Sequence, residues 1–485
     1  MTQKIPRYVS RKLEENYEYI KEKIGIGVSF DVGKRDLLLD DTMCHIYFVT
    51  GLCNTAYILE LMKELLDLNV DGYLQKQRRK AFDIIKNHII FQQVNEKDDL
   101  DEMITNLLSG MVVILVEGES KGFVVDLRSY PGRQPSEPET EKAIRGSRDG
   151  FTENIIINTA LVRRRIRDPY LRHELIQIGT QSKTDICMTY IEGVANPKTV
   201  EEVRKKLKSI DVDELTMSDK KLEEFIIDQK WNPYPKVRFT ERPDILAVHL
   251  YQGLVGIIVD NSPSVIIVPT TFFEQIHHVE EYRHTPIVGS FLRLFRTLGI
   301  FGSLYLVPVW LLFVLQPQYL PEQLSYIGPE ELGNVPIVAQ VLIAEIGIEF
   351  LRLASVHTPN ALTTAMGLVA GILVGQVAID VGLFSPEIVL YVSVSSLGSY
   401  ATPSYELALA NKIYKIVLII LTAIWGIYGL IGGFIFNTIF LASQNSFGRP
   451  YLYPIIPFSF KNFWGIFFRI NQNRPRREPD KDKLK

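Results

Sequence analysis

The feature that most limits how this 485-residue chain can fold is an apolar run at residues 291–315, FLRLFRTLGIFGSLYLVPVWLLFVL. The run exceeds the ~20 residues that a helix needs to cross a bilayer. Arg293 and Arg296 lie near its start, and positively charged residues gather on the cytosolic side of membrane proteins. The loop after it, residues 316–336, contains three glutamates, Glu322 among them, and no Lys or Arg. The sequence therefore predicts a membrane-spanning helix that starts from the cytosol.

Further apolar runs predict a membrane domain with several crossings. They lie at about residues 336–356, 361–384, 386–404 and 413–442. The C-terminal tail NRPRREPDKDKLK is basic and is expected in the cytosol, so the number of crossings should be even. Five runs make an odd number, and we therefore expect one of them not to cross.

The run at 386–404 is favoured as a re-entrant or broken segment. Its serines, Gly398 and Pro403 would leave backbone groups that need partners other than lipid. A consequence of this choice is that Lys412 and Lys415 face outward. The main alternative is that the run at 336–356 is the one that does not cross.

The chain before the first apolar run has the pattern of a soluble region. Its apolar segments are short, are separated by charge, and alternate between strand-like and helix-like periods. The N-terminus has no signal-peptide pattern, which favours a cytosolic location. Single cores stop growing at roughly 250–300 residues, so we expect several domains. The expected fold is an α/β (α+β) cytosolic N-terminal part with two subdomains, followed by an all-α polytopic membrane domain.

The expected boundaries follow the changes in composition. They are 1–100 for an N-terminal segment and the start of the first soluble subdomain, 101–215 for its remainder, 216–288 for the second soluble subdomain, 289–445 for a membrane domain with about four spans plus one re-entrant segment, and 446–485 for a cytosolic tail.

Local patterns within the soluble region predict particular elements. Strands are expected at 111–117 and 122–127, joined by a Gly-rich hairpin. Asn196 should cap a helix with Pro197 at its first position. A strand, a helix and then two strands around the turn 260–263 should follow.

Composition and motifs argue against several classes of function. A net charge of -3 gives no basis for a nucleic-acid partner. Cys44, Cys53 and Cys187 are odd in number and lack CxxC spacing, which is typical of reduced, buried thiols. The adjacent His277 and His278 cannot share a helix face, and no nucleophile, dinucleotide or phosphate-loop pattern occurs in a supporting context. We expect no enzyme activity, catalytic residue, cofactor or metal.

Charged residues interrupt the segment AEIGIEFLRLASVHTPN. Glu345, Glu349 and Arg352 are spaced i, i+4 and i+7, which places them on one helix face with Glu349 and Arg352 close enough to pair. Ionisable groups at bilayer depth usually face a protein interior or a water-filled pathway. Two interpretations remain open, an ion pathway or coupling site, and an internal salt bridge that locks neighbouring helices.

The next apolar run carries a stripe of small residues. Gly367, Gly371 and Gly375 recur every fourth residue, followed by Gln376 and Asp380. Such a face allows close helix packing and also suits the lining of a narrow pore shared by several subunits. Packing is the simpler interpretation, and this helix is also the first candidate to line a pore.

A basic cluster in the soluble region is a candidate for contacts between subunits. It consists of Arg163, Arg164, Arg165 and Arg167, with Arg172 close behind. An anion or lipid headgroup site is one interpretation. The simpler one is a solvated helix end, or salt bridges to the acidic segment 137–141 of the same or a neighbouring subunit.

Long stretches of the chain resemble the A-subunit family of bacterial spore germination receptors, the GerA-type membrane proteins. The resemblance runs through VDLRSYPGRQPSEPETEKAIRGSRDGFTENIIINTALVRRRIRDPYLRHELIQIGTQSKTDICMTYIEGVANP, ERPDILAVHLYQGLVGIIVDNSPSVIIVPTTFF and SFGRPYLYPIIPF, and covers nearly all of the chain after about residue 100. The earlier segment GVSFDVGKRDLLLDDTMCHIYFVTGLCNTAYILELMKEL is most similar to a paralogue encoded with the proteins that move dipicolinic acid.

This resemblance implies a location and partners. It implies residence in the spore inner membrane, with both termini in the cytosol, and assembly of the chain with itself into a ring, thought to be pentameric, that conducts ions during germination. Membrane lipid, a small membrane partner subunit and other germination proteins are the implied partners. The chain would then promote or amplify germination and dipicolinic acid release.

The family's membrane motif, roughly E-x3-E-x2-R-E-A-G-x-R-x-P, is similar to the segment from Glu345 to Pro359. Leu353, Ser355 and His357 stand where the family has an acidic residue, a glycine and a basic residue. We expect these differences to affect gating or ion preference. A cation channel is the first hypothesis and a non-conducting scaffold for germination proteins the second. A secondary transporter would require an inverted repeat of broken helices, which five unequal runs do not show.

Overall fold

The computed structural model describes most of the chain. The described residues are 7–71, 81–91, 93–130, 147–215, 218–227, 231–278, 280–329, 335–357 and 371–468. The chain divides into two compact units, one formed by residues 1–228 and 237–269, the other by 229–236 and 270–473. The first contains two β-sheets and the second is helical, which confirms the expected fold class.

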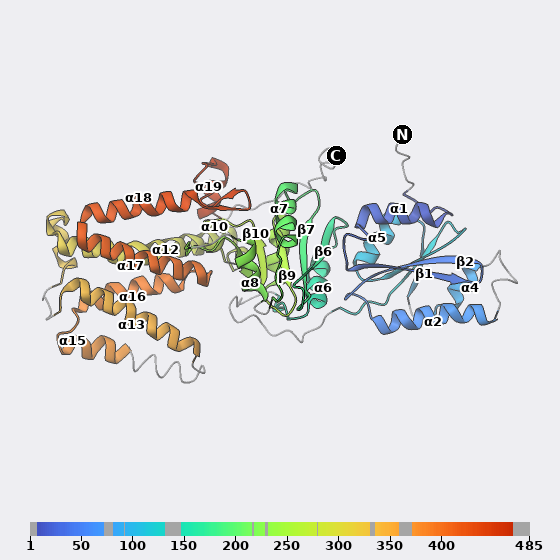
Figure 1. The fold of residues 1–485 in the computed structure, drawn as a ribbon, viewed down its shortest axis with the longest axis horizontal. Helices are drawn as coiled ribbons and strands as arrows, with labels where there is room; N and C mark the ends of the chain where they lie inside the picture. Colours follow the sequence, from blue (N-terminus) through green and yellow to red (C-terminus); the bar gives the residue numbers. More distant parts are fainter. Residues whose placement is uncertain are drawn as a thin grey trace. The chain divides into compact units, whose positions relative to one another are not determined.

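The first sheet has helices on both faces. Its strands are β1 (Val32–Leu39), β2 (Thr42–Val49), β3 (Val94–Lys97), β4 (Val112–Val116) and β5 (Gly122–Val125), antiparallel in the order β1-β2-β4-β5-β3. One face is covered by α1 (Leu13–Ile24) and α5 (Leu100–Leu108), the other by α2 (Thr55–Asp71) and α4 (Ala81–His88) (Figure 1).

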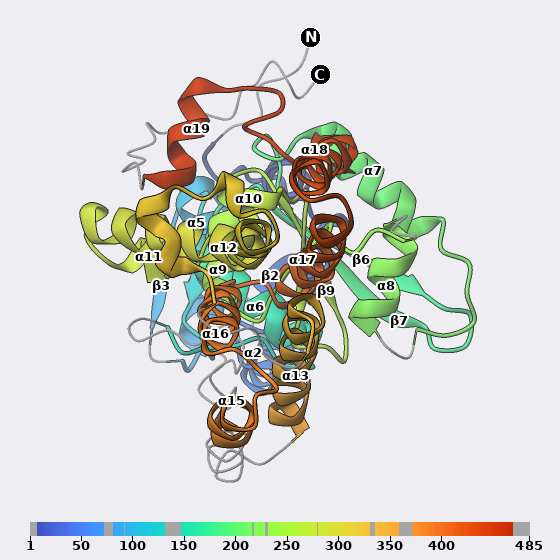
Figure 2. The same cartoon turned by 90° about the vertical axis from the view of Figure 1, so that its left-hand side faces the viewer.

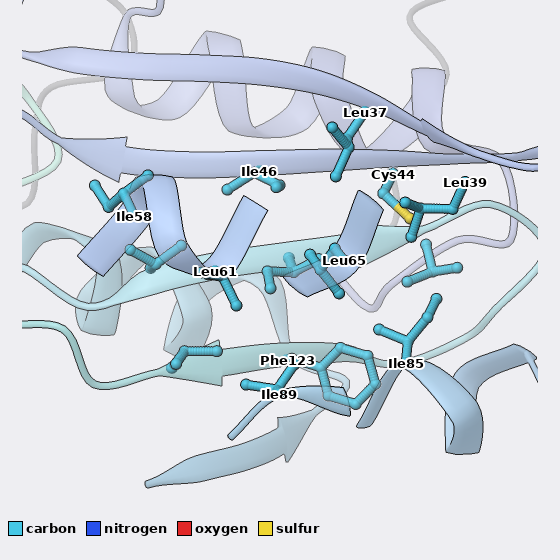
Figure 3. Close-up of a cluster of buried hydrophobic side chains, with 14 of the residues drawn as sticks. Leu37, Leu39, Cys44, Ile46, Ile58, Leu61, Leu65, Ile85, Ile89 and Phe123 are labelled. Carbon is cyan, nitrogen blue, oxygen red and sulfur yellow. The ribbon is translucent and has the colours of Figure 1, made fainter. Parts of the chain in front are cut away.

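Alternation along the strands builds a separate core on each face of this sheet. Figure 3 shows the core under α2 and α4, where Leu61 and Ile85 lie against Ile46 and Phe123. Neighbouring strand residues point to opposite faces, and Tyr47 accordingly belongs to the core under α1 and α5.

The second sheet repeats the arrangement of the first. Its strands are β6 (Leu171–Ile178), β7 (Thr184–Ile191), β8 (Arg238–Thr240), β9 (Val255–Val259) and β10 (Val265–Val268), in the order β6-β7-β9-β10-β8. The helices α6 (Ile155–Arg165) and α9 (Pro243–Tyr251) share one core with it, and α7 (Pro197–Lys208) and α8 (Ser218–Ile226) also contact it. Strand for strand, the two sheets have the same order, with a helix before the first strand and another between the third and fourth.

Two soluble subdomains are present, but the expected boundary near residue 215 is wrong. The hairpin β6–β7 was assigned to the first subdomain and instead pairs with β9 in the second sheet. The division between the sheets therefore falls between β5 and α6. Either strand of a hairpin can pair with a further strand. The local sequence does not show which strand that is when the partner lies far along the chain, as β9 does from β7.

The local predictions in the soluble region are confirmed. The strands β4 and β5 pair as an antiparallel hairpin, and so do β9 and β10. The Asn196 side chain accepts a hydrogen bond from the Lys198 amide at 3.0 Å, and α7 begins at Pro197. All three cysteines are buried and free.

The second unit consists mainly of helices. They are α10 (Phe272–Ile276), α11 (Glu280–Arg283), α12 (Pro286–Leu315), the 3-10 turns η2 (Pro317–Tyr319) and η3 (Glu322–Ile327), α13 (Ile337–His357), the π-helical η4 (Ile372–Val377), α15 (Ala378–Asp380), α16 (Pro386–Tyr400), α17 (Tyr405–Trp425), α18 (Ile427–Ser443) and α19 (Phe460–Phe467), with a short hairpin of β11 (Asn445–Ser446) and β12 (Arg449–Pro450). Figure 2 looks along the long helices and shows α12 beside α16 and α17.

The serines of the segment 386–404 do not interrupt its helix. Its first fifteen residues form the continuous helix α16, which packs along α12. The Ser395 hydroxyl donates to the Ser303 carbonyl at 2.8 Å, and the Ser396 hydroxyl donates to the Val392 carbonyl of its own helix at 2.8 Å. The hydroxyls therefore find partners without opening the helix.

The run 413–442 is two helices rather than one. Gly426 lies at φ 53° and ψ -131°, a conformation open mainly to glycine, and ends α17 before α18 begins. The Tyr414 hydroxyl donates to the Gly433 carbonyl at 2.6 Å, so α18 returns along α17. Dividing this run turns the five apolar runs of the sequence into six, and six runs can all cross while both termini stay on one side.

The long helices expose large apolar side chains and bury several polar ones within an otherwise apolar interior. Large exposed side chains on α13, α16 and α18 include Phe350 at 66%, Leu397 at 67% and Phe436 at 67%. Polar side chains that are buried include Ser395 at 0%, Thr422 at 0% and Asn437 at 5%. Among the described helices, α12 and α17 are long and apolar enough to cross a membrane, and α18 is apolar but shorter. The many large apolar side chains on the surface set this unit apart from a soluble protein.

Candidate functional site: a ladder of buried ion pairs

Two ion pairs join α13 to α17. The Lys415 ammonium lies 2.7 Å from a carboxylate oxygen of Glu345, and the Lys412 ammonium lies 2.7 Å from one of Glu349. The glutamates are four residues apart on one helix and the lysines three apart on the other, so each pair lies on facing surfaces about one turn from the next. We call Glu345, Glu349, Lys412, Lys415 and Arg352 the ion-pair ladder.

Arg352 extends the ladder by one step. Its Nε donates to Glu349 at 3.1 Å, as the spacing predicts, and its guanidinium lies 5.2 Å from the centroid of the Tyr405 ring. Glu349 therefore bridges two cations, one from its own helix and one from α17.

Burial increases along the ladder. The side chains of Glu345 and Lys415 are 0% and 4% exposed, whereas Glu349 is 22% exposed. Lys415 also donates to the Ser395 hydroxyl on α16 at 3.1 Å. Removing charges from water is costly unless they are paired, so this deepest pair depends on both partners.

A small pocket lies beside the ladder and contains an amide that needs a partner. Its lining includes Ser399 and Tyr400 of α16 together with Asn411, Lys412 and Lys415 of α17. Asn411 is 4% exposed, and neither polar atom of its side chain has a hydrogen-bond partner within the described part of the chain. The ladder holds three cations against two carboxylates. The pocket can therefore offer polar and charged groups to water or an ion.

The structure brings Glu345, Glu349 and Arg352 together with partners that sequence reasoning missed. These partners are Lys412, which is half-buried, and Lys415, which is buried. The pairing could have been inferred from the sequence, because the two lysines are three residues apart in an apolar part of the chain. Their charge is opposite to that of the two glutamates.

The candidate pore residues lie elsewhere in the unit. Gly371, Gly375, Gln376 and Asp380 belong to the segment 371–380, where Gly371, Gln376 and Asp380 are exposed and Gly375 is half-buried. A Cβ added to Gly371 or Gly375 would meet no described atom within 4 Å. Gly367 and Pro359 lie outside the described residues. The small face is thus not packed against described parts of its own chain.

Close glycine packing occurs instead between α12 and α16. A Cβ built on Gly398 would lie 2.3 Å from the Gly299 carbonyl oxygen, closer than any real contact. The two helices therefore approach through their backbones at this point, as small residues allow in membrane proteins. Gly299 and Ser303 are small residues four positions apart on α12, and this spacing is the local signal for the contact.

In the soluble unit, Arg163 cannot serve as a contact between subunits. It is 1% exposed and pairs with the equally buried Asp31, with 2.8 Å between Nε and the carboxylate. Its guanidinium also donates to the Ser29 hydroxyl and to the Leu171 carbonyl. The pair joins the segment before β1 to the helix before β6. Its partner comes from 132 residues earlier in the chain, which spacing could not reveal.

The other arginines of the cluster differ from Arg163. Arg164 is exposed and lies over the Tyr130 ring, 4.7 Å from its centroid, and Arg165 pairs with Asp149 at 2.8 Å. Arg172 is buried and pairs with Glu192 at 2.7 Å. Arg167 is exposed. Contacts with another subunit remain a proposal for Arg164 and Arg167, and the acidic segment 137–141 lies outside the described residues.

The pair Asp31–Arg163 has a histidine beside it. His173 is fully buried, and its Nδ1 lies 2.9 Å from the Thr189 hydroxyl. Burial lowers the pKa of His173 from 6.5 to about 4, although Asp31 opposes that shift. Burial is the largest single influence and would raise the pKa of Asp31. The charges of Arg163 and His173, together with hydrogen bonding by Arg163 and Ser29, outweigh burial in sum and lower that pKa below 3.8.

The pH dependence of the soluble unit should follow from His173. A histidine whose pKa is lower in the folded state stabilises the fold above pH 6.5 and loses that contribution as the pH falls toward 4. The loss is about 3 kcal/mol at most, since each pKa unit corresponds to about 1.4 kcal/mol. Hydrogen exchange of the α6 and β6 amides in the full-length protein, corrected for intrinsic rates, should accelerate over this range.

Two variants test the assignment to His173. His173→Gln should flatten the pH dependence between 6.5 and 4, whereas His284→Gln, at an exposed histidine, should leave it unchanged. An unchanged profile in His173→Gln would mean that another group carries the effect. Asp31 acts only at lower pH, because its pKa is already below the ordinary 3.8.

The first unit contains two sheets with the same strand order, and the second unit is helical, with apolar side chains on its surface and charged side chains inside. These features define a membrane protein with a large soluble region. A family model of the Bacillus/Clostridium GerA spore germination protein matches residues 18–481. The chain therefore belongs to the GerA family of spore germination proteins.

Two relatives from Bacillus subtilis agree with this assignment. The chain is 51% identical to stage V sporulation protein AF of Bacillus subtilis (strain 168), over 95% of this chain and 93% of that one. It is 30% identical to spore germination protein KA of the same organism, over 99% and 89%. It also matches the crystal structure of the N-terminal domain of the A subunit of the Bacillus megaterium spore germinant receptor GerK3, with 31% identity, a TM-score of 0.43, and coverage of 55% and 97%.

Proposed function

We propose that this chain is a GerA-type membrane protein of the spore inner membrane that forms a homo-oligomeric cation channel and promotes germination and dipicolinic acid release. The observation that carries the proposal is the ion-pair ladder inside a helical unit with apolar outer surfaces. Charges at this depth are expensive and usually serve a pathway or a coupling site.

The ladder and the segment 361–380 have different roles in this proposal. The exposed small face at Gly371 and Gly375, with Gln376 and Asp380, lines a pore between subunits of a pentameric ring. Glu345, Glu349 and Arg352, paired to the lysines of α17, hold the surrounding helices and couple their positions to the pore. Opening is a population shift, driven by a signal that binds one state more tightly than the other.

The direction of the helices supports a topology with six crossings and both termini in the cytosol. Gln340 near the start of α13 accepts from the Ser385 amide just before α16, at 2.9 Å, while the end of α16 packs near the first half of α12 at Gly299. Since α12 crosses the membrane starting from the cytosol, α13 and α16 run back toward the cytosol. The helix α17 then crosses away from the cytosol, and α18 crosses back to it.

Ion flux through purified full-length protein in liposomes tests the channel. Gly371→Trp should abolish flux while the oligomer keeps its size, because a bulky side chain closes a narrow pore. Glu349→Ala should change conduction or assembly, since Arg352 and Lys412 lose their common partner. Glu322→Ala, at an exposed position in η3, is the control and should behave as wild type.

The results distinguish a channel from a non-conducting scaffold. Undiminished flux in Gly371→Trp would contradict the placement of the pore. An intact ring without flux would be tested again with membrane extract from spores, to supply a missing small partner subunit.

A non-conducting scaffold that gathers germination proteins is the second candidate. The observation in its favour is the exposed glycine face, which equally suits packing against other membrane helices. It predicts that substitutions at Gly371 and Gly375 disturb assembly and never alter ion selectivity.

A further inference from the structure

The helix α19 presents an aromatic stripe on its outer side. Phe460 and Trp464 of the helix and Phe468 directly after its end follow one another at intervals of four residues and are 69%, 44% and 49% exposed. Their rings are neighbours, with centroids 6.3 Å apart for the first pair and 5.7 Å for the second. Phe458, in the loop before the helix, is 62% exposed and adds to the stripe.

The inner side of α19 fixes its place in the helical unit. Ile466 is 2% exposed and lies in a core with Ile300 of α12, Leu407 of α17 and Leu441 of α18. The Arg293 guanidinium donates to the Gly465 carbonyl at 2.6 Å. The start of α17 and the end of α18 thus meet α19 together with the first half of α12. The helix therefore lies at one end of the apolar bundle.

The charges at this end fit a membrane surface. Arg293 and Arg296 of α12 both pair with the buried Glu281, which compensates one of their two positive charges within the protein. Exposed aromatic residues on α12, Phe291 and Phe295, flank Arg293 in the sequence, and their centroids are 4.4 Å apart. The sequence after α19, residues 469–485, contains seven Lys or Arg and three Asp or Glu.

We propose that α19 is an interfacial helix whose aromatic stripe, Phe460, Trp464 and Phe468, inserts into the headgroup region of an anionic bilayer. The amphipathic ring of tryptophan favours the boundary between headgroups and acyl chains, and interfacial helices bury an apolar face that includes Phe about 5–10 Å into it. The basic sequence that follows adds attraction to anionic lipid. The short helix would thereby hold the cytosolic end of α12 at a fixed depth through the contact between Arg293 and Gly465.

Site-directed spin labelling of the full-length protein tests this proposal. The three native cysteines are buried, so a nitroxide can be placed by Phe460→Cys or Trp464→Cys in protein reconstituted into vesicles of phosphatidylglycerol and phosphatidylethanolamine. Asn462→Cys, at an exposed polar position between them on another side of the helix, is the matched control. Labels at the stripe should be relaxed strongly by oxygen and weakly by a water-soluble nickel reagent, and the control label the reverse.

Two results would overturn the proposal. Stripe labels as accessible to nickel as the Asn462→Cys label would mean that the stripe faces water. Stripe labels shielded from both reagents would mean that a protein surface covers it.

A second measurement avoids cysteine variants that fail to fold. Fluorescence of the wild-type protein minus that of Trp464→Phe isolates the signal of Trp464 among the four tryptophans of the chain. Lipids with a doxyl group near the carboxyl end of the acyl chain should quench this difference signal more than lipids with the group near the methyl end. Equal, absent or reversed quenching would contradict an interfacial position.

Discussion

Glu345→Ala should severely destabilise the helical unit, by about 3–5 kcal/mol, because it leaves the ammonium of Lys415 buried without its counter-charge. Lys415 is 4% exposed, and the Ser395 hydroxyl, which also contacts its ammonium, is neutral. Unfolding of the purified full-length protein in detergent, followed by thermal aggregation or by titration with a denaturing detergent, would measure the loss.

Two comparisons show whether the loss comes from the ion pair. Glu322→Ala removes an exposed glutamate and should change the stability by less than about 0.5 kcal/mol. Replacing both partners by neutral residues of similar volume, Glu345→Gln with Lys415→Met, should recover much of the loss, because no charge is then left buried. A Glu345→Ala protein as stable as Glu322→Ala would show that the pair contributes little.

Gly398→Ala should separate α16 from α12. The added methyl group would lie 2.3 Å from the Gly299 carbonyl oxygen, and this atom is backbone and cannot turn aside. Overpacking of this kind costs about 1–3 kcal/mol, and more where the backbone must move. The shift should also weaken the hydrogen bond from Ser395 to the Ser303 carbonyl, and with it the support of Lys415.

The control lies on the partner helix. Gly302→Ala introduces the same methyl group one turn from Gly299, where no described atom lies within 4 Å. Alanine is the better helix former by about 1 kcal/mol, so this variant should be neutral or slightly stabilised. Equal melting of the two variants in detergent would mean that the close approach of the helices is not required.

The sequence predicted those features that depend on local pattern. Hairpins such as β4–β5, the Asn196 cap and the long apolar helix α12 follow from turn residues, capping chemistry and length. The pairing of Glu349 with Arg352 follows from helical spacing.

Features that depend on distant contacts could not be predicted in this way. The partners of Glu345 and Glu349 lie more than sixty residues away on α17, where no spacing rule applies. The division between α17 and α18 depends on a single glycine in an apolar sequence, without the polar loop that usually marks a turn. Sheet membership of β6 and β7 depends on pairing with β9, which follows three helices and a strand later in the chain.

The matching order of the two sheets makes each half of the soluble unit an internal reference for the other. Gly110 before β4 and Gly253 before β9 both have positive φ, at 95° and 88°, and each follows the helix between the third and fourth strand. Asn54 and Asn196 both accept hydrogen bonds from the first turn of the helix after the second strand. The change in stability caused by a substitution in one half is therefore the expected value at the equivalent position of the other half. A difference between the two values would identify a position with a role in only one half.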